Sequence, residues 1–299
     1  MRDRSALLRK VTIVVLTHNR CAELARTLDR LEMARADGAP EVVVVDNAST
    51  DGTARSLRGR RDVRVVRLAR NAGGAGRNAG ATTARTPYVA FCDDDTWWGA
   101  GSLETAVAAL EQRRDVAVVC GRVLVGSDQR LDQTCAQMAH SPLGVGDEVG
   151  GHPVLGFLAG ACVVRRDAFL SAGGFDERFF IGGEEELVAL DLAVRGWQLR
   201  YLPAVVVHHH PSDQRDPSRR RLIMLRNRLW VGLLRYPAGL LFRHTREVFA
   251  QAGRHRLRRA VLAETARGLP WLLRGRDRLP SRVARQVELL QCHLADTSG

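Results

Sequence analysis

Three consecutive aspartates, Asp93, Asp94 and Asp95, are the side chains of this sequence best suited to bind a cation. They follow an apolar run at residues 88–92 that is typical of a buried strand. Like charges this close repel one another, and a bound divalent cation removes that cost. In an extended chain Asp93 and Asp95 point to the same side and offer two oxygen ligands, with positions left open for a diphosphate. The alternative is a set of solvated loop acids, one of which caps the following helix.

Asp46 is a second acid at the end of an apolar run, here residues 41–45. An acid at the carboxyl end of a strand can accept hydrogen bonds from a ribose or a base amide. The segment DNASTDGT that it opens is also typical of a turn in which Ser49 or Thr50 caps a helix. In isolation, the turn is the favoured interpretation of this segment.

The glycine-rich segment at residues 71–78, NAGGAGRN, combines small residues that admit a close backbone approach with the guanidinium of Arg77, which suits phosphate. Gly74, Gly76 and Ala79 also match the GxGxxA pattern of dinucleotide-binding proteins, with an acid about twenty residues later. This match makes an NAD-dependent oxidoreductase an alternative. Against it, the pattern needs a tight turn directly after its strand, and a ribose needs one acid where this chain has three.

A further acidic group, Glu184, Glu185 and Glu186, follows two glycines and opens a helix predicted at residues 184–194. The helix macrodipole favours ionised carboxylates in this first turn. Such a carboxylate can take a proton from an attacking hydroxyl. Because successive helix positions diverge by about 100°, at most two of the three can face one cleft. The alternative is an acidic first turn that only stabilises its helix.

His208, His209 and His210 end the last extended run of the body. An imidazole nitrogen is a common metal ligand, so one of the three could ligate a metal. The sequence shows no Ser-His-Asp arrangement and no P-loop. Candidate chemistry therefore rests on the acids, the glycine-rich segment and these histidines.

Short β-branched runs alternate with helical stretches over the first two hundred residues, which predicts an α/β, Rossmann-like fold with a mostly parallel central sheet flanked by helices. The predicted strands are residues 11–16, 41–45, 63–68, 88–92, 116–125, 157–164 and 199–207. Pro203 predicts an edge or a break in the last of them. Polar residues at the carboxyl ends of buried strands line the crevice in which such sheets bind ligands. Residues 126–156 lack periodicity and predict a long loop.

Charge divides the 299 residues into a neutral body and a basic tail. Residues 1–210 hold 26 basic and 26 acidic residues, whereas residues 211–299 hold 19 basic and 7 acidic ones, so the tail carries the whole net charge of +12. Apolar positions in the tail step by three and four, which predicts helices punctuated by Pro237, Pro270 and Pro280. We therefore predict a catalytic domain at 1–210 and a basic, helical C-terminal extension at 211–299.

The tail allows two equally weighted interpretations. The run Arg219, Arg220 and Arg221 beside a Leu/Trp face suits an anionic membrane surface. The other interpretation is a helical appendage with a solvated arginine face, because Arg outnumbers Lys 44 to 1 and inflates the charge. Nucleic acid is not expected as a partner, since the aromatic residues lie among leucines as core residues do.

Six scattered cysteines without a CxxC pair indicate neither a disulfide framework nor a zinc site, and they fit a reducing cytosol. The N-terminal residues lack a signal-peptide pattern, and no run reaches the roughly 20 apolar residues of a membrane span. We expect a cytoplasmic protein, peripheral on the inner face of the membrane if the tail binds lipid.

Taken in series, the motifs of residues 11–210 resemble those of family-2 glycosyltransferases with a GT-A fold. The segments that carry the resemblance are VTIVVLTHNR, EVVVVDNASTDGT, ARNAGGAGRNAG, YVAFCDDDTWW, GACVVRRDAF, GGFDERFF, GGEEELVALDLAVRGW and YLPAVVVHHH. The resemblance implies an inverting enzyme that uses Mn²⁺ or Mg²⁺ and moves a sugar from a nucleotide-diphosphate sugar to the hydroxyl of a saccharide or lipid-linked acceptor. It is compatible with cell-surface polysaccharide or glycolipid synthesis. A catalytically dead protein that only binds a nucleotide sugar is a further alternative.

The resemblance also implies roles for single residues. The positions expected to contact the donor are Thr17, Asn19, Arg20, Asp46, Asn71, Arg77 and Asp94. The positions expected to hold the metal are Asp93, Asp95 and His209. Glu185 corresponds to the catalytic base, with Glu184 beside it, although the family generally has aspartate at the base. Leu187 and Asp191 stand where many relatives have Asp and Arg, so we expect acceptor handling to differ from theirs.

Overall fold

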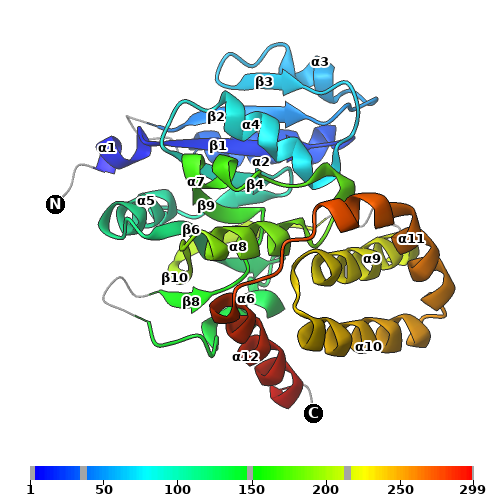
Figure 1. Cartoon of the computed structure of the whole chain (residues 1–299). Coiled ribbons are helices and arrows are strands. Elements are labelled where there is room, and N and C mark those ends of the chain that lie inside the picture. Colours follow the sequence, from blue (N-terminus) through cyan, green and yellow to red (C-terminus); the bar gives the residue numbers. More distant parts are fainter. Residues whose placement is uncertain (1–3, 34–38, 147–150, 212–216, 298–299) are drawn as a thin grey trace.

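A central sheet with helices packed on it forms the body of the molecule (Figure 1). The protein is described from a computed structural model, which covers residues 4–33, 39–146, 151–211 and 217–297. The strands are β1 (Val11–Thr17), β2 (Glu41–Asp46), β3 (Arg64–Arg67), β4 (Tyr88–Asp93), β5 (Thr96–Trp98), β6 (Val116–Val125), β7 (Arg130–Leu131), β8 (His152–Val154), β9 (Ala161–Arg165) and β10 (Gln198–His209). Their order is β3-β2-β1-β4-β9-β6-β10-β5, with β7 beside β6 and β8 beside β10.

The two halves of the sheet differ in strand direction. β1 pairs in parallel with β2 and β4, and β2 with β3. β9 runs antiparallel between β4 and β6, whereas β10 is parallel to β6 and antiparallel to β5 and β8. The predicted α/β fold is confirmed, with the detail that the sheet is mixed. An apolar run buried on both faces has the same sequence pattern in a parallel and in an antiparallel strand, so the sequence did not distinguish the antiparallel neighbours.

Helices cover the sheet because its central strands are apolar on both faces. The helices of the body are α1 (Arg4–Leu8), α2 (Cys21–Met33), α3 (Thr53–Leu57), α4 (Arg77–Thr83), α5 (Ser102–Gln112), α6 (Gln133–Ala139), α7 (Arg166–Ser171) and α8 (Glu184–Val194), with short 3-10 helices η1 (Gly73–Gly76) and η2 (Glu177–Phe179). Gly80 brings α4 onto β1, since a Cβ at this position would meet the side chain of Val14. Helix α8 begins and ends at the predicted residues.

The predicted loop at residues 126–156 is partly wrong, because the described part of it contains α6 and two short strands. Asp132 starts α6 by accepting a hydrogen bond from the backbone N–H of Thr134 at 2.8 Å. β8 pairs with β10, which gives it a partner that no local pattern reveals. Residues 147–150 lie outside the described residues.

Two other strand predictions need correction. The strand predicted at 157–164 begins only at Ala161. β5 was not predicted at all, since its three residues are too few for a periodic pattern. Pro203 does mark an irregularity, because the register of β10 against β6 shifts between Leu202 and Val206, although β10 has neighbours on both sides.

The tail is helical, as expected. Its helices are α9 (Pro217–Arg235), α10 (Ala238–Arg254), α11 (Arg258–Arg274) and α12 (Ser281–Thr297). Pro237 and Pro280 lie at helix boundaries, but Pro270 lies inside α11, so its predicted role as punctuation is wrong. A proline in a helix leaves the carbonyl four residues earlier without its donor. Ala266 and Pro270 are both exposed, so water can satisfy that carbonyl.

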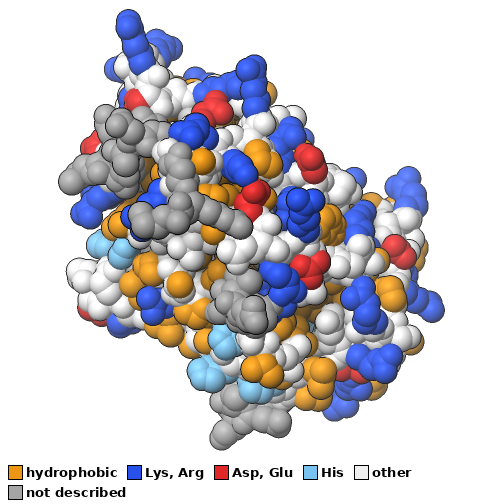
Figure 2. All heavy atoms as spheres, turned by 90° about the vertical axis from the view of Figure 1, so that its left-hand side faces the viewer, with side chains coloured by type: hydrophobic (Ala, Val, Ile, Leu, Met, Phe, Trp, Pro, Cys, Tyr) orange, Lys and Arg blue, Asp and Glu red, His pale blue; other side chains and the backbone are white. Residues whose placement is uncertain are grey.

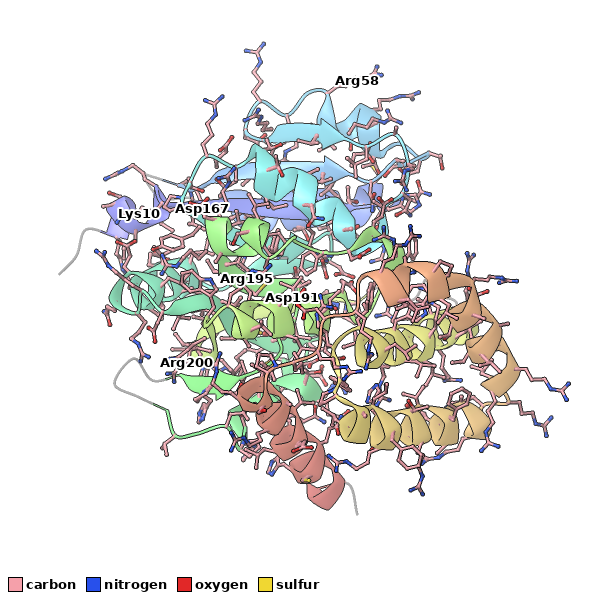
Figure 3. All side chains as sticks on the ribbon, in the orientation of Figure 1. Lys10, Arg58, Asp167, Asp191, Arg195 and Arg200 are labelled. Atoms are coloured by element: carbon pink, nitrogen blue, oxygen red, sulfur yellow. The ribbon has the colours of Figure 1, made fainter. Side chains whose placement is uncertain are left out.

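The tail packs against α8 through a second apolar core, separate from the core of the sheet (Figure 1). Its members are Phe179, Leu187, Leu190 and Ala193 from the body, and Trp230, Val231, Leu234, Tyr236, Leu240, Leu272, Leu279, Val283, Ala284 and Val287 from the tail. Asp191 of α8 accepts two hydrogen bonds from Arg235 of α9, at 2.6 and 2.9 Å, and Figure 3 shows Asp191 on the part of α8 beside the tail. Asp191 thus anchors α9.

Basic side chains are not confined to the tail. Figure 2, which faces the left-hand side of Figure 1, shows Lys and Arg side chains spread over the surface with acidic ones between them. A neutral body with interspersed charges of both signs fits the even count of 26 basic and 26 acidic residues in 1–210.

Candidate active site

A cleft of about 570 Å³ opens at the carboxyl ends of β1 and β4. These strands are parallel neighbours, so the polar residues that end them come together. All but two of the predicted site residues line this cleft; those present are Thr17, Arg20, Asn71, Arg77, Asp93, Asp94, Asp95, Glu184, Glu185 and His209. Most of the residues selected from the sequence therefore line a single cleft in the fold.

Asp94, the middle aspartate, is held against the end of β1. Thr17 donates its hydroxyl to Asp94 Oδ2 at 2.9 Å, and Arg20 Nη1 lies 3.3 Å from Oδ1. Burial raises the pKa of Asp94 to about 7, against the opposing effect of Arg20. Asp94 is therefore a buried acid whose carboxylate is held by β1 and the loop that follows it.

Asp95 joins the start of α2 to the last strand. Arg20 Nη1 donates to Asp95 Oδ2 at 2.9 Å, and His209 Nε2 lies 3.5 Å from Asp95 Oδ1. The antiparallel pairing of β10 with β5 sets His209 opposite Thr96, next to Asp95. This topology explains how a histidine 114 positions later (209 − 95) reaches the aspartate triplet.

Asp93 forms an ion pair with Arg77, the first residue of α4. Arg77 is buried, and its Nη1 also donates to the carbonyl oxygen of Gly74 at 3.3 Å. Burial alone would lower the pKa of Arg77, but the charges of Asp93 and Glu185 outweigh it and raise that pKa. Arg77 is thus a fixed positive charge between two groups of acids.

Glu184 and Glu185 open α8 directly after Gly183, which has a φ of 90°. Both line the cleft, whereas Glu186 turns away and accepts a hydrogen bond from the hydroxyl of Tyr236 at 2.7 Å. Two of the three glutamates therefore face the cleft, which agrees with the limit set by helix geometry.

The environment of this glutamate pair disfavours its ionisation. Burial, reinforced by the charge of Glu185, raises the pKa of Glu184 to about 8. Burial also raises the pKa of Glu185, although its own backbone N–H and the charge of Arg77 oppose that rise. A carboxylate of raised pKa is a stronger base when it is ionised, but below that pKa it already carries the proton.

The glycines of η1 allow its backbone to pack closely against the backbone of Phe180. Gly73 has a φ of 59°, and a Cβ there would overlap the carbonyl group of Phe180. The backbone N–H of Gly74 donates to that same carbonyl oxygen at 2.6 Å. The segment forms a 3-10 helix before α4, several residues after β3 ends at Arg67, so it is not the tight strand-to-helix turn of a dinucleotide site. This geometry disfavours the oxidoreductase alternative.

Asp46 and Asn19 do not line the cleft. Asp46 is fully buried and accepts a hydrogen bond from the backbone N–H of Ser49 at 2.8 Å, as in the turn interpretation of this segment. Asn19, with a φ of 55°, accepts one from the backbone N–H of Thr50 at 2.7 Å. Here both side chains order the loops after β1 and β2, and their predicted contact with a nucleoside stays a prediction.

Several polar cleft residues were missed by sequence reasoning, among them Asn47, Asp132 and Arg220. Asn47 holds the glycine-rich segment, because its Oδ1 accepts from Ala72 N at 2.8 Å and its Nδ2 donates to Gly73 O at 3.0 Å. Its place directly after Asp46, at a strand end, was an available signal. Asp132 and Arg220 also line the cleft, but they come from α6 and α9, and no local pattern connects those helices to the strand ends.

The donors present suit a divalent cation only in part. Asp95 and His209 lie together, and carboxylate and imidazole are ligands that Mn²⁺ accepts. Asp93 is engaged by Arg77. Within the described ranges, no group of three or more His, Cys, Asp or Glu side chains is arranged to hold a metal ion. The residues thus fit a cation with few protein ligands and open positions for the oxygens of a ligand.

Comparison with known proteins gives a consistent result. The profile of the family described as "Glycosyl transferase family 2" matches residues 12–171. A protein of Mycobacterium tuberculosis named N-acetylglucosaminyl-diphospho-decaprenol L-rhamnosyltransferase is 29% identical over 244 residues, which cover 69% of this chain and 78% of that protein. The family match includes β1 from its second residue, the glycine-rich segment and β4.

Two solved structures share the fold. The crystal structure of GalNAc-T7 with UDP, GalNAc and Mn²⁺ superposes with a TM-score of 0.62 at 15% identity and covers 87% of this chain and 57% of that one. Residues 1–349 of S. aureus TarS in complex with UDP-GlcNAc superpose with a TM-score of 0.57 at 16% identity, covering 92% and 82%. In the part of the chain that is described, no helix has the length and apolar character needed to cross a membrane.

Proposed function

This chain belongs to glycosyl transferase family 2, and on that premise we propose that it transfers a sugar, with inversion, from a nucleotide-diphosphate sugar to a hydroxyl of a saccharide or lipid-linked acceptor. One observation carries the proposal. Arg77 lies between Asp93 and the Glu184–Glu185 pair in one cleft at the carboxyl ends of β1 and β4. The cleft therefore sets a fixed cation next to a candidate base, as displacement of a diphosphate requires.

The transfer is a single displacement in this proposal. The acceptor oxygen attacks the anomeric carbon while the bond from that carbon to the diphosphate oxygen breaks. The nucleoside diphosphate leaves with the bonding electrons, and the hydroxyl proton passes to Glu185. Attack on the face opposite the leaving group inverts the anomeric centre. Arg77 stabilises the charge that develops on the diphosphate.

Glu185 is the better candidate for the base than Glu184. Both carboxylates line the cleft, but Glu184 is the more deeply buried of the two. Glu185 is only partly buried and faces the charge of Arg77, which opposes the rise of its pKa. In this scheme Glu184, whose pKa is raised to about 8 by burial and by the charge of Glu185, keeps its proton at neutral pH, so Glu185 is the ionised member of the pair.

Asp95 and His209, with Asp93, are the residues that would hold Mn²⁺ or Mg²⁺. The bound ion would supply a Lewis acid for the diphosphate oxygens. Thr17, Arg20, Asn71 and Asp94 would bind and orient the rest of the donor. Asn19 and Asp46 would support that part of the cleft through the loops that they order.

The acceptor class rests on one relative. The name N-acetylglucosaminyl-diphospho-decaprenol L-rhamnosyltransferase describes the acceptor of that protein as a saccharide attached to a lipid diphosphate. We extend the same class to this chain as a step in cell-surface polysaccharide or glycolipid synthesis, carried out by a cytoplasmic or peripheral membrane protein.

Binding of nucleotides tests the proposal and separates it from its alternatives. UDP, GDP, dTDP and NAD are titrated into the protein by calorimetry, each with and without Mn²⁺. We expect Mn²⁺-dependent binding of at least one nucleoside diphosphate and turnover of the matching sugar nucleotides. Metal-independent binding of NAD alone would favour an oxidoreductase, and binding without any turnover would favour a protein with a dead site.

A further inference from the structure

We propose that the outer face of α11 is a docking surface for an anionic membrane. Leu262, Leu269 and Leu273 are 59%, 44% and 66% exposed on this helix. Their spacing of seven and four residues places them within about 40° of one another around the helix axis. Ala266 and Pro270, also exposed, widen this sector to about 100°. Five apolar side chains thus form one outward stripe.

The stripe is not needed to hold α11 in the protein. The buried residues of the helix, Val261, Thr265, Gly268 and Leu272, lie in a neighbouring sector that begins about 40° from Leu269. Gly268 brings α11 close to α9, since a Cβ there would lie 2.8 Å from the ring of Trp230. Because packing uses the inner face, the outer leucines are free to contact something else.

Charge around the stripe favours anionic lipid. Four exposed arginines belong to this helix: Arg258, Arg259, Arg267 and Arg274. Glu264 is the one acid of α11, and it forms ion pairs with Arg226 and Arg267. An exposed apolar stripe flanked by arginine is the pattern of a helix that lies in the plane of a membrane surface.

This surface differs from the one suggested by the sequence. The run at residues 219–221 precedes a Leu/Trp face of α9, but Leu225, Leu229 and Trp230 of that face are buried in the tail. This Leu/Trp face of α9 is therefore used for packing within the tail. A second copy of the chain is also a poor occupant for α11, because two arginine-flanked stripes would repel one another.

α11 also lies close to the cleft. Trp271, on its inner side, packs edge-on against Phe179 with ring centroids 6.4 Å apart. The next residue, Phe180, lines the cleft. A membrane on the outer face of α11 would lie about one helix diameter from the loop that borders the candidate site. This link to a lipid-linked acceptor rests on the proposed function, whereas membrane binding itself does not.

Co-sedimentation of the whole chain with vesicles tests the proposal. Phosphatidylcholine vesicles are compared with vesicles containing about one third phosphatidylglycerol. We expect the protein to pellet with the anionic vesicles and to stay in the supernatant with the neutral ones. The triple variant Leu262→Ser, Leu269→Ser and Leu273→Ser should lose about tenfold or more of this binding, since each leucine contributes apolar area.

A matched control changes three exposed apolar residues of the body, Val65→Ser, Leu131→Ser and Val145→Ser, and should bind like the unchanged protein. A second variant, Arg259→Gln with Arg274→Gln, tests whether the arginines contribute to vesicle binding. It provides an independent test of the surface if the leucine variant fails to fold.

Unchanged pelleting of either α11 variant would overturn the proposal, as would failure of the unchanged protein to bind anionic vesicles. A leucine-dependent dimer in sedimentation velocity, without vesicle binding, would overturn it in favour of self-association. UDP, GDP and dTDP binding is measured on the same samples. Vesicle binding without nucleotide binding would refute the proposed function alone. Nucleotide binding without vesicle binding would refute the membrane surface alone.

Discussion

The side-chain amide of Asn227, buried in α9, donates to the carbonyl oxygen of Phe179 at 2.7 Å, 48 positions earlier in the chain. The same amide lies 3.0 Å from the carbonyl oxygen of Ile181 and 2.5 Å from that of Gly182. This stretch leads into Glu184 and also supplies the Phe180 carbonyl that accepts from Gly74. Asn227 therefore fixes, from the tail, the segment that joins the glutamate pair to the glycine-rich corner.

We predict that Asn227→Asp lowers kcat by about tenfold to a hundredfold, because a shift of about 1 Å in a positioned group costs that much. The variant keeps the shape of the side chain but replaces its donors with an acceptor that faces three carbonyls. KM for the donor should change less than kcat, since the donor contacts of β1 and β4 are not touched. Steady-state kinetics measures both.

The control for this prediction is Thr265→Val, a nearly isosteric change in the buried part of the tail that does not reach the cleft. It should alter the melting temperature without separating kcat from KM. If Asn227→Asp lost stability while kcat held, Asn227 would be a structural residue with no part in positioning.

Asp95→Asn should abolish Mn²⁺-dependent transfer. The change keeps the size of the side chain but removes the charge that faces Arg20 and His209. A neutral amide is a much poorer ligand for Mn²⁺ or Mg²⁺ than a carboxylate. Turnover is followed against Mn²⁺ concentration, with Asp128→Asn at an exposed turn as the control. Wild-type metal dependence in the Asp95 variant would remove this residue from the metal site.

Glu184 should make folding stability fall as pH rises. Its ordinary pKa of 4.5 is raised to about 8 in the folded protein by burial and by Glu185. Between these values the unfolded chain has lost the proton and the folded chain still binds it, so stability decreases from about pH 4.5 to pH 8. Glu184→Gln cannot ionise and should melt a few degrees higher than the unchanged protein at pH 8, with a smaller difference at pH 5.

Thermal unfolding at the two pH values measures this effect. Arg77 faces the pair from α4 and moderates the shift without cancelling it. Equal losses of melting temperature in the variant and the unchanged protein between pH 5 and pH 8 would show that Glu184 is not the group responsible.

The parallel half of the sheet could be predicted from sequence because its strands carry their own signal. Residues 41–45 and 88–92 are uniform apolar runs that end in acids, and parallel strands bring such ends to one edge. The same logic placed Asp93 and Asp95 at that edge, whereas Thr17 was expected there from the family resemblance. Asp46 does not line the cleft, since its side chain accepts a hydrogen bond within its own turn, and single-sequence patterns do not decide between these uses of an aspartate.

The contribution of the tail could not be predicted in the same way. Asn227, Trp230, Val231 and Leu234 lie on a second buried face of α9, but a solvated polar residue at position 227 gives the same sequence pattern. Its partners lie in a loop near Gly182, and such distant pairings have no local signature. Arg220 was missed as a cleft residue for the same reason.

The central claim is that Glu185 accepts the proton in a sugar transfer within this cleft. Its most direct test is Glu185→Gln, which keeps the shape of the side chain and removes its basicity. Nucleoside diphosphate binding is measured by calorimetry and turnover by product formation from the matching sugar nucleotide. We predict binding within about twofold of the unchanged protein and a loss of turnover of about a thousandfold or more. Turnover at the unchanged rate in this variant would contradict the account.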